Sequence, residues 1–294
     1  MKTFIFLTVF LLFFEIPIFA QSNNLRLEVY LSKNIFLKGE QIYLNNLLIN
    51  KGEQSIKSRK LKPCDLYYKV KIKNSTGNIF KYLNNIQYFR DTALSLLLPP
   101  NDTVNQMLEL IGNYSPIKQN WTSLTTKCFF PVDKYSIYTT LETGYGITSS
   151  NELSFEVIEP NGEDLSAFNM LEEASEYFIK RDFKTSARIL NSIQDKYPKS
   201  PYSLQALRQI MAMYTFTENP DEQKVGYDAA MKLIETSPAS EAADYALTHI
   251  LARTGKILTT QEIRKNLLQK ISISHPNTEI GRRASNIIKK YYDK

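Results

Sequence analysis

The sequence predicts a chain of two domains, a β-sheet domain followed by an all-helical repeat domain. In residues 21–158, Tyr, Phe, Val, Ile and Thr are frequent and apolar residues recur at every second position. In residues 165–294, one pattern recurs three times with constant internal spacing. Alternation with period two is typical of strands that bury one face, and a repeat of roughly 40 residues is typical of stacked helical hairpins.

The repeated pattern places a Pro, a hydroxyl residue, an Ala and an Ile at fixed spacing. Its copies begin at Pro198, Pro238 and Pro276, so the period is 40 and then 38 residues. The hydroxyl residue is suited to cap a starting helix, and the Pro bars continuation of the previous one. The Ala and Ile of each copy lie four residues apart, on one helical face. We predict that they form the seam between hairpins: Ala206, Ile210, Ala246, Ile250, Ala284 and Ile288.

Helix boundary signals agree with the repeat. Asn219 before Pro220 indicates a helix start, Gly255 a helix end, and Thr259 with Glu262 a capping box. We therefore predict seven helices, which would form three hairpins and a capping helix. They are expected near 165–180, 183–197, 201–217, 220–236, 240–254, 260–273 and 278–292.

The stretch Tyr197–Ala206 resembles the helix junction of tetratricopeptide-type repeats in bacterial envelope proteins, notably the outer-membrane assembly lipoproteins and the Tol-Pal coordinator proteins. Arg181-Asp182-Phe183 resembles the turn between the paired helices of these repeats. The resemblance covers residues 165–294 but lacks the Trp and Gly signature positions and exceeds the usual length of about 34 residues. It implies a tetratricopeptide-like α-solenoid that binds protein segments.

The β domain is predicted to be an immunoglobulin-like β-sandwich spanning residues 21–158. Its first and last strands, 25–31 and 153–157, each alternate apolar and polar residues. About seven or eight short strands in this length are typical of that fold. The stretches Leu37–Leu44 and Asp133–Tyr138 resemble strands of bacterial immunoglobulin-like modules, and Tyr135 is expected to have a structural role as a tyrosine corner.

Two short segments define the remaining organisation. Glu159-Pro160-Asn161-Gly162 indicates a linker over residues 159–164. A signal peptide is indicated over residues 1–20 by Lys2, by an apolar run of 11 residues ending at Phe14, and by the small residue Ala20. The run is shorter than the roughly 20 residues of a membrane-spanning helix. We therefore expect an exported protein, periplasmic or extracellular, without a transmembrane segment after signal cleavage.

Cys64 and Cys128 are the only two cysteines, and both lie in the β domain. Export favours a disulfide between them, but two buried free thiols are the alternative.

Positive charge is concentrated in the β domain. Residues 21–158 hold 16 Lys and Arg against 11 Asp and Glu, whereas residues 159–294 hold 19 against 18. Basic residues cluster at 57–62, with Lys57, Arg59, Lys60 and Lys62, and continue along one predicted strand face with Lys69, Lys71 and Lys73. Such a face suits an anionic polysaccharide, lipopolysaccharide or an acidic protein, or it is a solvated strand that discourages edge-to-edge pairing. Export argues against a nucleic-acid partner.

No catalytic, cofactor-binding or metal-binding pattern occurs in the sequence. The two histidines, His249 and His275, are far from further ligand-type clusters, and no zinc, phosphate-loop or nucleophile-elbow motif is present. Trp121 suits either stacking on a sugar ring or filling a core. The sequence therefore predicts a non-enzymatic protein-binding or scaffold protein of the bacterial cell envelope, whose helices grip a protein or peptide partner. The alternative is a carbohydrate-binding or protease-inhibiting module that acts through the β domain.

Overall fold

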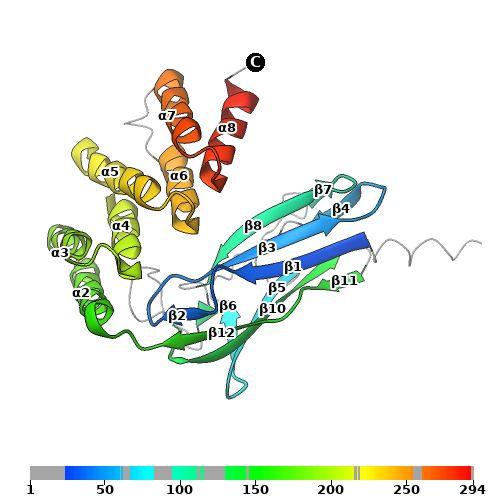
Figure 1. Cartoon of the computed structure of the whole chain (residues 1–294), viewed down its shortest axis with the longest axis horizontal. Helices are drawn as coiled ribbons and strands as arrows, with labels where there is room; N and C mark the ends of the chain where they lie inside the picture. Colours follow the sequence, from blue (N-terminus) through cyan, green and yellow to red (C-terminus); the bar gives the residue numbers. More distant parts are fainter. Residues whose placement is uncertain are drawn as a thin grey trace, which may run out of the picture. The chain divides into compact units, whose positions relative to one another are not determined.

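The structure is a computed structural model that describes residues 24–59, 61, 67–82, 95–110, 114–115, 130–143, 146–214, 217, 219–253 and 260–292. The chain divides into two compact units, and the boundary falls between Ile158 and Glu159, where the linker was predicted to begin (Figure 1). Strands make up the first unit, here the β unit, and helices the second, here the helical unit. The predicted signal peptide, both cysteines and Trp121 lie outside the described residues.

The β unit contains short strands that follow one another along the chain. They are β1 (Leu25–Leu31), β2 (Ile35–Leu37), β3 (Tyr43–Asn50), β4 (Ile56–Arg59), β5 (Tyr68–Asn74), β6 (Ile79–Tyr82), β7 (Ser95–Leu98), β8 (Thr103–Glu109), β9 (Tyr114–Ser115), β10 (Asp133–Thr143), β11 (Gly146–Ser149) and β12 (Leu153–Ile158). They pair into three sheets. The first has the order β1-β3-β8, the second β2-β12-β10-β5-β6-β9 with β11 on β10, and the third β4-β7.

One hydrophobic core supports the β unit, and the predicted alternation places residues in it. In β1, Leu25, Leu27 and Val29 are buried while Arg26 and Tyr30 are exposed. Aromatic rings from distant segments meet in the same core. The Tyr135 ring stacks on Phe155 at 5.0 Å between centroids and meets Phe130 edge-on at 5.2 Å. The Tyr135 hydroxyl donates a 2.6 Å hydrogen bond to the Pro131 carbonyl, which agrees with the structural role expected for this residue.

A buried polar contact links two of the sheets. The Tyr68 hydroxyl on β5 donates to Oδ1 of Asn46 on β3, and the Asn46 amide donates to the carbonyls of Leu44 and Gln106 at 3.0 and 3.1 Å. Burial raises the pKa of the Tyr68 phenol well above its ordinary value, so the group stays protonated and remains a donor. A polar group buried without a partner is costly, so this contact favours one relative placement of β3 and β5.

The helical unit contains seven helices within the described residues. They are α2 (Gly162–Ile179), α3 (Phe183–Lys196), α4 (Pro201–Tyr214), α5 (Pro220–Thr236), α6 (Glu241–Arg253), α7 (Gln261–Ser274) and α8 (Glu279–Tyr291). Each helix from α2 to α5 packs against the next, α7 packs against α8, and α8 contacts α6 (Figure 1).

The three predicted junctions share one hydrogen-bond pattern. The amides of Ser200, Ser240 and Thr278 each donate to the carbonyl three residues earlier. Their hydroxyls in turn accept amide hydrogens of the next helix, at 3.4 Å from Tyr202, 3.1 Å from Ala243 and 3.2 Å from Gly281. The capping role predicted for the hydroxyl residues is confirmed.

The other helix boundary signals have mixed outcomes. Asn219 caps α5 as predicted, through a 3.0 Å bond from the amide of Asp221. The cap of α7 is Thr260 and not Thr259, because the Thr260 hydroxyl accepts from the amide of Ile263 at 3.2 Å. Gly255 and Thr259 lie outside the described residues.

The predicted fold class, an immunoglobulin-like β-sandwich followed by a tetratricopeptide-like α-solenoid, is wrong. The structure is a mixed fold, with a β-sheet region, which forms three sheets among the described residues, followed by a helical region. One edge of the largest sheet is a parallel pair, in which Phe36 of β2 lies opposite Val157 of β12. Strand alternation and helix spacing are local signals. They predicted which residues are buried, but they carry no information on how distant segments pair into sheets or stack.

Candidate functional site

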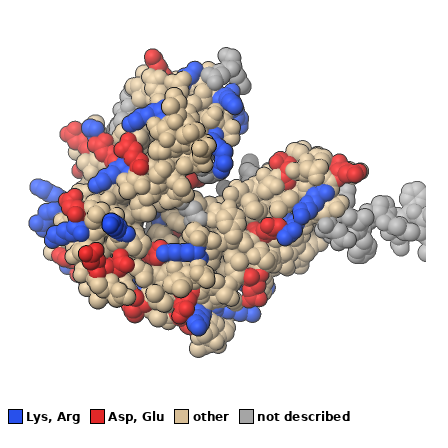
Figure 2. All heavy atoms as spheres, in the orientation of Figure 1, with Lys and Arg blue, Asp and Glu red and all other residues tan. Residues whose placement is uncertain are grey.

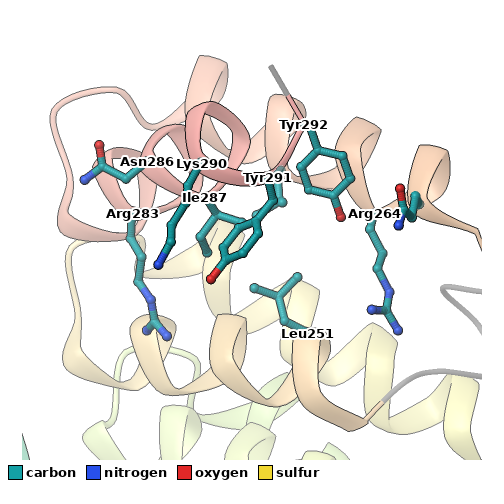
Figure 3. Close-up of a pocket in the computed structure, with 10 residues that line it drawn as sticks. Leu251, Arg264, Arg283, Asn286, Ile287, Lys290, Tyr291 and Tyr292 are labelled. Carbon is teal, nitrogen blue, oxygen red and sulfur yellow. The ribbon is translucent and has the colours of Figure 1, made fainter. Parts of the chain in front are cut away.

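A groove in the helical unit, between α6, α7 and α8, is a candidate site. Its volume is about 650 Å³. Figure 3 shows Arg283 and Lys290 on one side and Arg264 on the other, with Leu251, Ile287 and Tyr291 between them. The described residues that line it are Leu251, Gln261, Arg264, Leu268, Arg283, Asn286, Ile287, Lys290, Tyr291 and Tyr292. We call this cavity the α6–α8 groove.

Arg283 fixes one wall of the groove. Its Nη1 donates to Oδ1 of Asp244 on α6 at 2.7 Å and to the Thr248 hydroxyl at 2.9 Å. Both members of the Arg283–Asp244 ion pair are partly shielded from solvent, which makes the contact stronger than a fully exposed pair. The pair therefore anchors α8 to α6 and sets the width of the groove at this end.

The apolar part of the groove comes from all three helices. Leu268 of α7 is fully buried, Leu251 of α6 and Ile287 of α8 are half-buried, and Tyr291 at the end of α8 is 62% exposed. The Lys290 ammonium lies 5.0 Å from the centre of the Tyr291 ring, within the range of a cation–π contact. An exposed aromatic ring beside buried aliphatic side chains offers a surface for an apolar group of a ligand.

The electrostatics of the groove are one-sided. Its described lining residues include Arg264, Arg283 and Lys290 but no Asp or Glu. Asp244 offsets the charge of Arg283 from behind, and further cations at Arg282 and Lys289 lie on exposed parts of α8. Figure 2 shows Lys and Arg atoms gathered on the helical unit near its C-terminal end. The groove can therefore attract carboxylates and other anions.

The predicted basic strand face forms a second, flatter surface. Lys69 and Lys73 on β5 are exposed, and Lys71 lies 5.3 Å from the ring of Tyr138 on the neighbouring β10. β5 pairs with β10 on one side and with β6 on the other. Because β6, as far as the structure describes it, pairs only with Ile72 and Lys73, protection of a strand edge remains a prediction for Lys69 and Lys71. Of the residues clustered at 57–62, Lys57 is exposed, while Lys60, Lys62 and the side chain of Arg59 are not described.

The residues predicted to form the repeat seam are all buried. Exposed fractions are 0% for Ala206, Ala246 and Ala284, and at most 8% for Ile210, Ile250 and Ile288. They lie on α4, α6 and α8, and α6 contacts both of the others. These residues therefore belong to the core of the helical unit and do not line the groove.

The cations and tyrosines of the groove were not singled out in the sequence. A signal was present, because Arg283, Ile287, Lys290 and Tyr291 recur at spacings of three, four and seven, which places them on one face of a helix. That α6 and α7 complete the groove depends on tertiary packing.

Within the described residues, no cluster of three His, Cys, Asp or Glu is placed to hold a metal ion.

Comparisons with other proteins do not assign a family. No protein-family model matches the sequence, and no curated protein matches it significantly. Among solved structures, the Pseudomonas fluorescens alkylpurine DNA glycosylase AlkC is 12% identical over 46% of this chain and 30% of its own, with a TM-score of 0.27. The Bacillus subtilis sporulation control protein Spo0M is 14% identical over 51% of this chain and 55% of its own, with a TM-score of 0.28. This chain thus covers less than two thirds of either protein, and similarity at this level carries no functional argument.

In the described parts of the chain, no helix is both long enough and apolar enough to span a membrane.

Proposed function

We propose that this chain is an exported, non-enzymatic protein-binding or scaffold protein of the bacterial cell envelope, and that its helical unit holds the protein partner. The α6–α8 groove carries the proposal. It is an open, partly apolar cavity of about 650 Å³ that three helices line with cationic and aromatic side chains. Exposed apolar and aromatic side chains with a polar rim are typical of protein interaction sites.

The pattern in residues 1–20 supports the export part of the proposal. Cleavage after Ala20 is expected when the chain is produced in a bacterial host. N-terminal sequencing of the protein recovered from the periplasm or medium would test it, and an intact N-terminus on a cytoplasmic product would contradict it.

The binding part is tested by capture from envelope extracts. The mature protein and two deletions, one lacking residues 165–294 and one lacking residues 21–158, are immobilised in parallel. We expect the same specific partner to be retained by the mature protein and by the helical unit, and lost from the β unit, provided that each fragment is folded by circular dichroism. Retention by the β unit alone would contradict the proposal.

The non-enzymatic part is tested by incubating the protein with envelope glycans and peptides. Hydrolysis that disappears with a single carboxylate or hydroxyl substitution, without unfolding, would show that the protein is an enzyme.

One observation favours a second candidate function. Lys69, Lys71 and Lys73 share an outer sheet face with Tyr138, and cations beside an aromatic ring are suited to an anionic polysaccharide. Under this alternative, the β unit alone would bind a carboxylated or sulfated glycan, and replacing Lys71 by Glu would abolish the binding.

A further inference from the structure

The α6–α8 groove has the shape of a site for a chain segment and not for an enclosed small molecule. Its lining residues Gln261, Asn286, Lys290 and Tyr291 are all exposed. Small-molecule sites typically bury about 70–90% of the ligand, which requires a deeper cavity than one with so much of its lining in solvent. A groove of this kind fits one or two side chains of a longer polymer that continues beyond it at both ends.

The charge of the groove selects an acidic segment. Among the described residues, three cations and no carboxylate line it, and one of the cations, Arg283, is held in place by Asp244. Figure 3 places Arg283 and Lys290 on one side and Arg264 on the other. Carboxylates on both sides of a central residue would therefore each meet a cation.

The apolar middle of the groove requires that central residue to be hydrophobic. Leu251, Ile287 and the exposed ring of Tyr291 lie between the cations in Figure 3. An anionic polysaccharide would satisfy the cations but would leave this apolar area uncovered. The side-chain amides of Gln261 and Asn286 can both donate to and accept from a peptide main chain.

We propose that the α6–α8 groove binds an acidic peptide segment of the partner protein, with a Phe or Leu side chain over Leu251 and Tyr291 and with carboxylates on either side. This inference rests on the proposed function and specifies its ligand.

Lys290 and Lys289 allow a matched test. Both are exposed cations in the last turn of α8, where they interact equally with the helix dipole, but only Lys290 lines the groove. Tyr291→Ala and Ile273→Ala form a second pair, since both residues are exposed, at 62% and 77%, and only Tyr291 lines the groove.

The probe is a fluorescently labelled peptide, Glu-Asp-Phe-Leu-Asp-Glu, titrated with the purified protein and followed by anisotropy. Lys290→Glu is expected to weaken binding about tenfold or more, and Lys289→Glu by no more than about twofold, because only the first reverses a charge in contact with the peptide. Tyr291→Ala is expected to weaken binding about fivefold, and Ile273→Ala to leave it unchanged. Thermal melting of each variant verifies that it is folded.

Comparison peptides distinguish an acidic peptide with an apolar centre from other possible ligands of the groove. A peptide with Gly-Ser in place of Phe-Leu, or with Lys in place of the acidic residues, is expected to bind much more weakly. Equal affinity for the Gly-Ser peptide, or tighter binding of a heparin oligosaccharide, would show a polyanion site and overturn the proposal. Equal effects of Lys289→Glu and Lys290→Glu, or no binding of the acidic peptide, would also overturn it.

The remaining alternative ligand of the groove is a second copy of this chain. Its α2 could supply the acidic segment, because α2 carries five acidic residues and no basic one. Self-association in sedimentation that Lys290→Glu abolishes, without peptide binding, would replace the partner segment by that copy. If the helical unit still captured its envelope partner and Lys290→Glu had no effect on that capture, this inference would fail while the proposed function remained. Loss of all capture by the helical unit would reject the proposed function itself.

Discussion

The β unit and the helical unit differ in how far along the chain their defining contacts extend. In the helical unit, each predicted junction is held by a hydrogen bond over three residues, such as that from the Ser200 amide to the Tyr197 carbonyl. In the β unit, Phe36 of β2 pairs with Val157 of β12, and Asn46 contacts Tyr68 across two sheets. Short-range contacts leave a pattern in the sequence that can be recognised, and long-range pairings do not. The two units should therefore respond differently to substitution.

The largest effect expected is physical separation of the two units. Limited proteolysis should cut between residues 158 and 168, because the exposed Asn161 and Gly162, the latter with φ of 55°, lie at the boundary between the units. Mass spectrometry should find one fragment with a β-sheet circular dichroism spectrum and one with a helical spectrum. A resistant chain without cleavage in this interval would show that the units are not independent.

Gly281→Ala should cause the largest loss from a single residue. A Cβ at Gly281 would lie 1.9 Å from the carbonyl oxygen of His275, which is impossible without backbone movement. Helix propensity alone predicts a gain of about 1 kcal/mol for this change, whereas the clash predicts a loss of about 3 kcal/mol. Denaturant melts followed by far-ultraviolet circular dichroism decide between the two signs, and a stabilised protein would show that the turn relaxes.

Ala246→Leu tests packing in the middle of the helical unit. Ala246 is fully buried on α6, so the larger side chain should overpack the core and cost about 1 to 3 kcal/mol. The unfolding transition of the helical unit should shift, while that of the β unit should not. Ala242→Leu, at a half-buried position of the same helix, is the control. Equal unfolding midpoints for Ala246→Leu and Ala242→Leu would mean that Ala246 does not lie at a close contact between helices.

Tyr68→Phe tests the polar link inside the β unit. The change leaves Oδ1 of Asn46 buried without the Tyr68 donor, which should cost about 2 kcal/mol. The unfolding transition of the β unit should move and the helical signal should stay constant. Tyr138→Phe, at a half-buried position on the outer face, should have almost no effect. If Tyr68→Phe and Tyr138→Phe changed the free energy of unfolding equally, the hydrogen bond between Tyr68 and Asn46 would contribute nothing to stability.

The smallest effect expected concerns the acid sensitivity of α3. The side chain and amide of Thr185 donate to the Asp182 carboxylate, the amide at 3.0 Å, and hold the pKa of this carboxyl below its ordinary value. Because the folded-state pKa is lowered, the stabilisation is present above the unfolded-state pKa of about 3.9 and is lost as pH falls through the folded-state value.

Asp182→Asn keeps a capping acceptor but cannot titrate, so it should remove this part of the pH dependence and preserve most of the stability at neutral pH. Melting midpoints between neutral pH and strong acid measure the difference. If the melting midpoints of the wild type and of Asp182→Asn fell in parallel as the pH is lowered, Asp182 would not contribute to acid unfolding.

Part of the groove could have been found from the sequence. Arg283, Ile287 and Lys290 lie on one helical face by spacing alone, and the ends of α8 follow from Thr278 and from the position of the last repeat. That Arg283 faces Asp244 could not be predicted, because the two residues belong to different helices and lie 39 positions apart.

The sequence by itself determined the order of a β-sheet region and a helical region, the caps at Ser200, Ser240 and Thr278, and the buried faces of β1 and β12, since each depends on neighbouring residues. The tertiary structure alone decided how the described strands pair into sheets and that α6, α7 and α8 enclose a groove. It also set the close approach of the His275 carbonyl to Gly281. The physical reason is that these features arise from packing and hydrogen bonding between segments far apart in sequence, on which local propensity and periodicity have no influence.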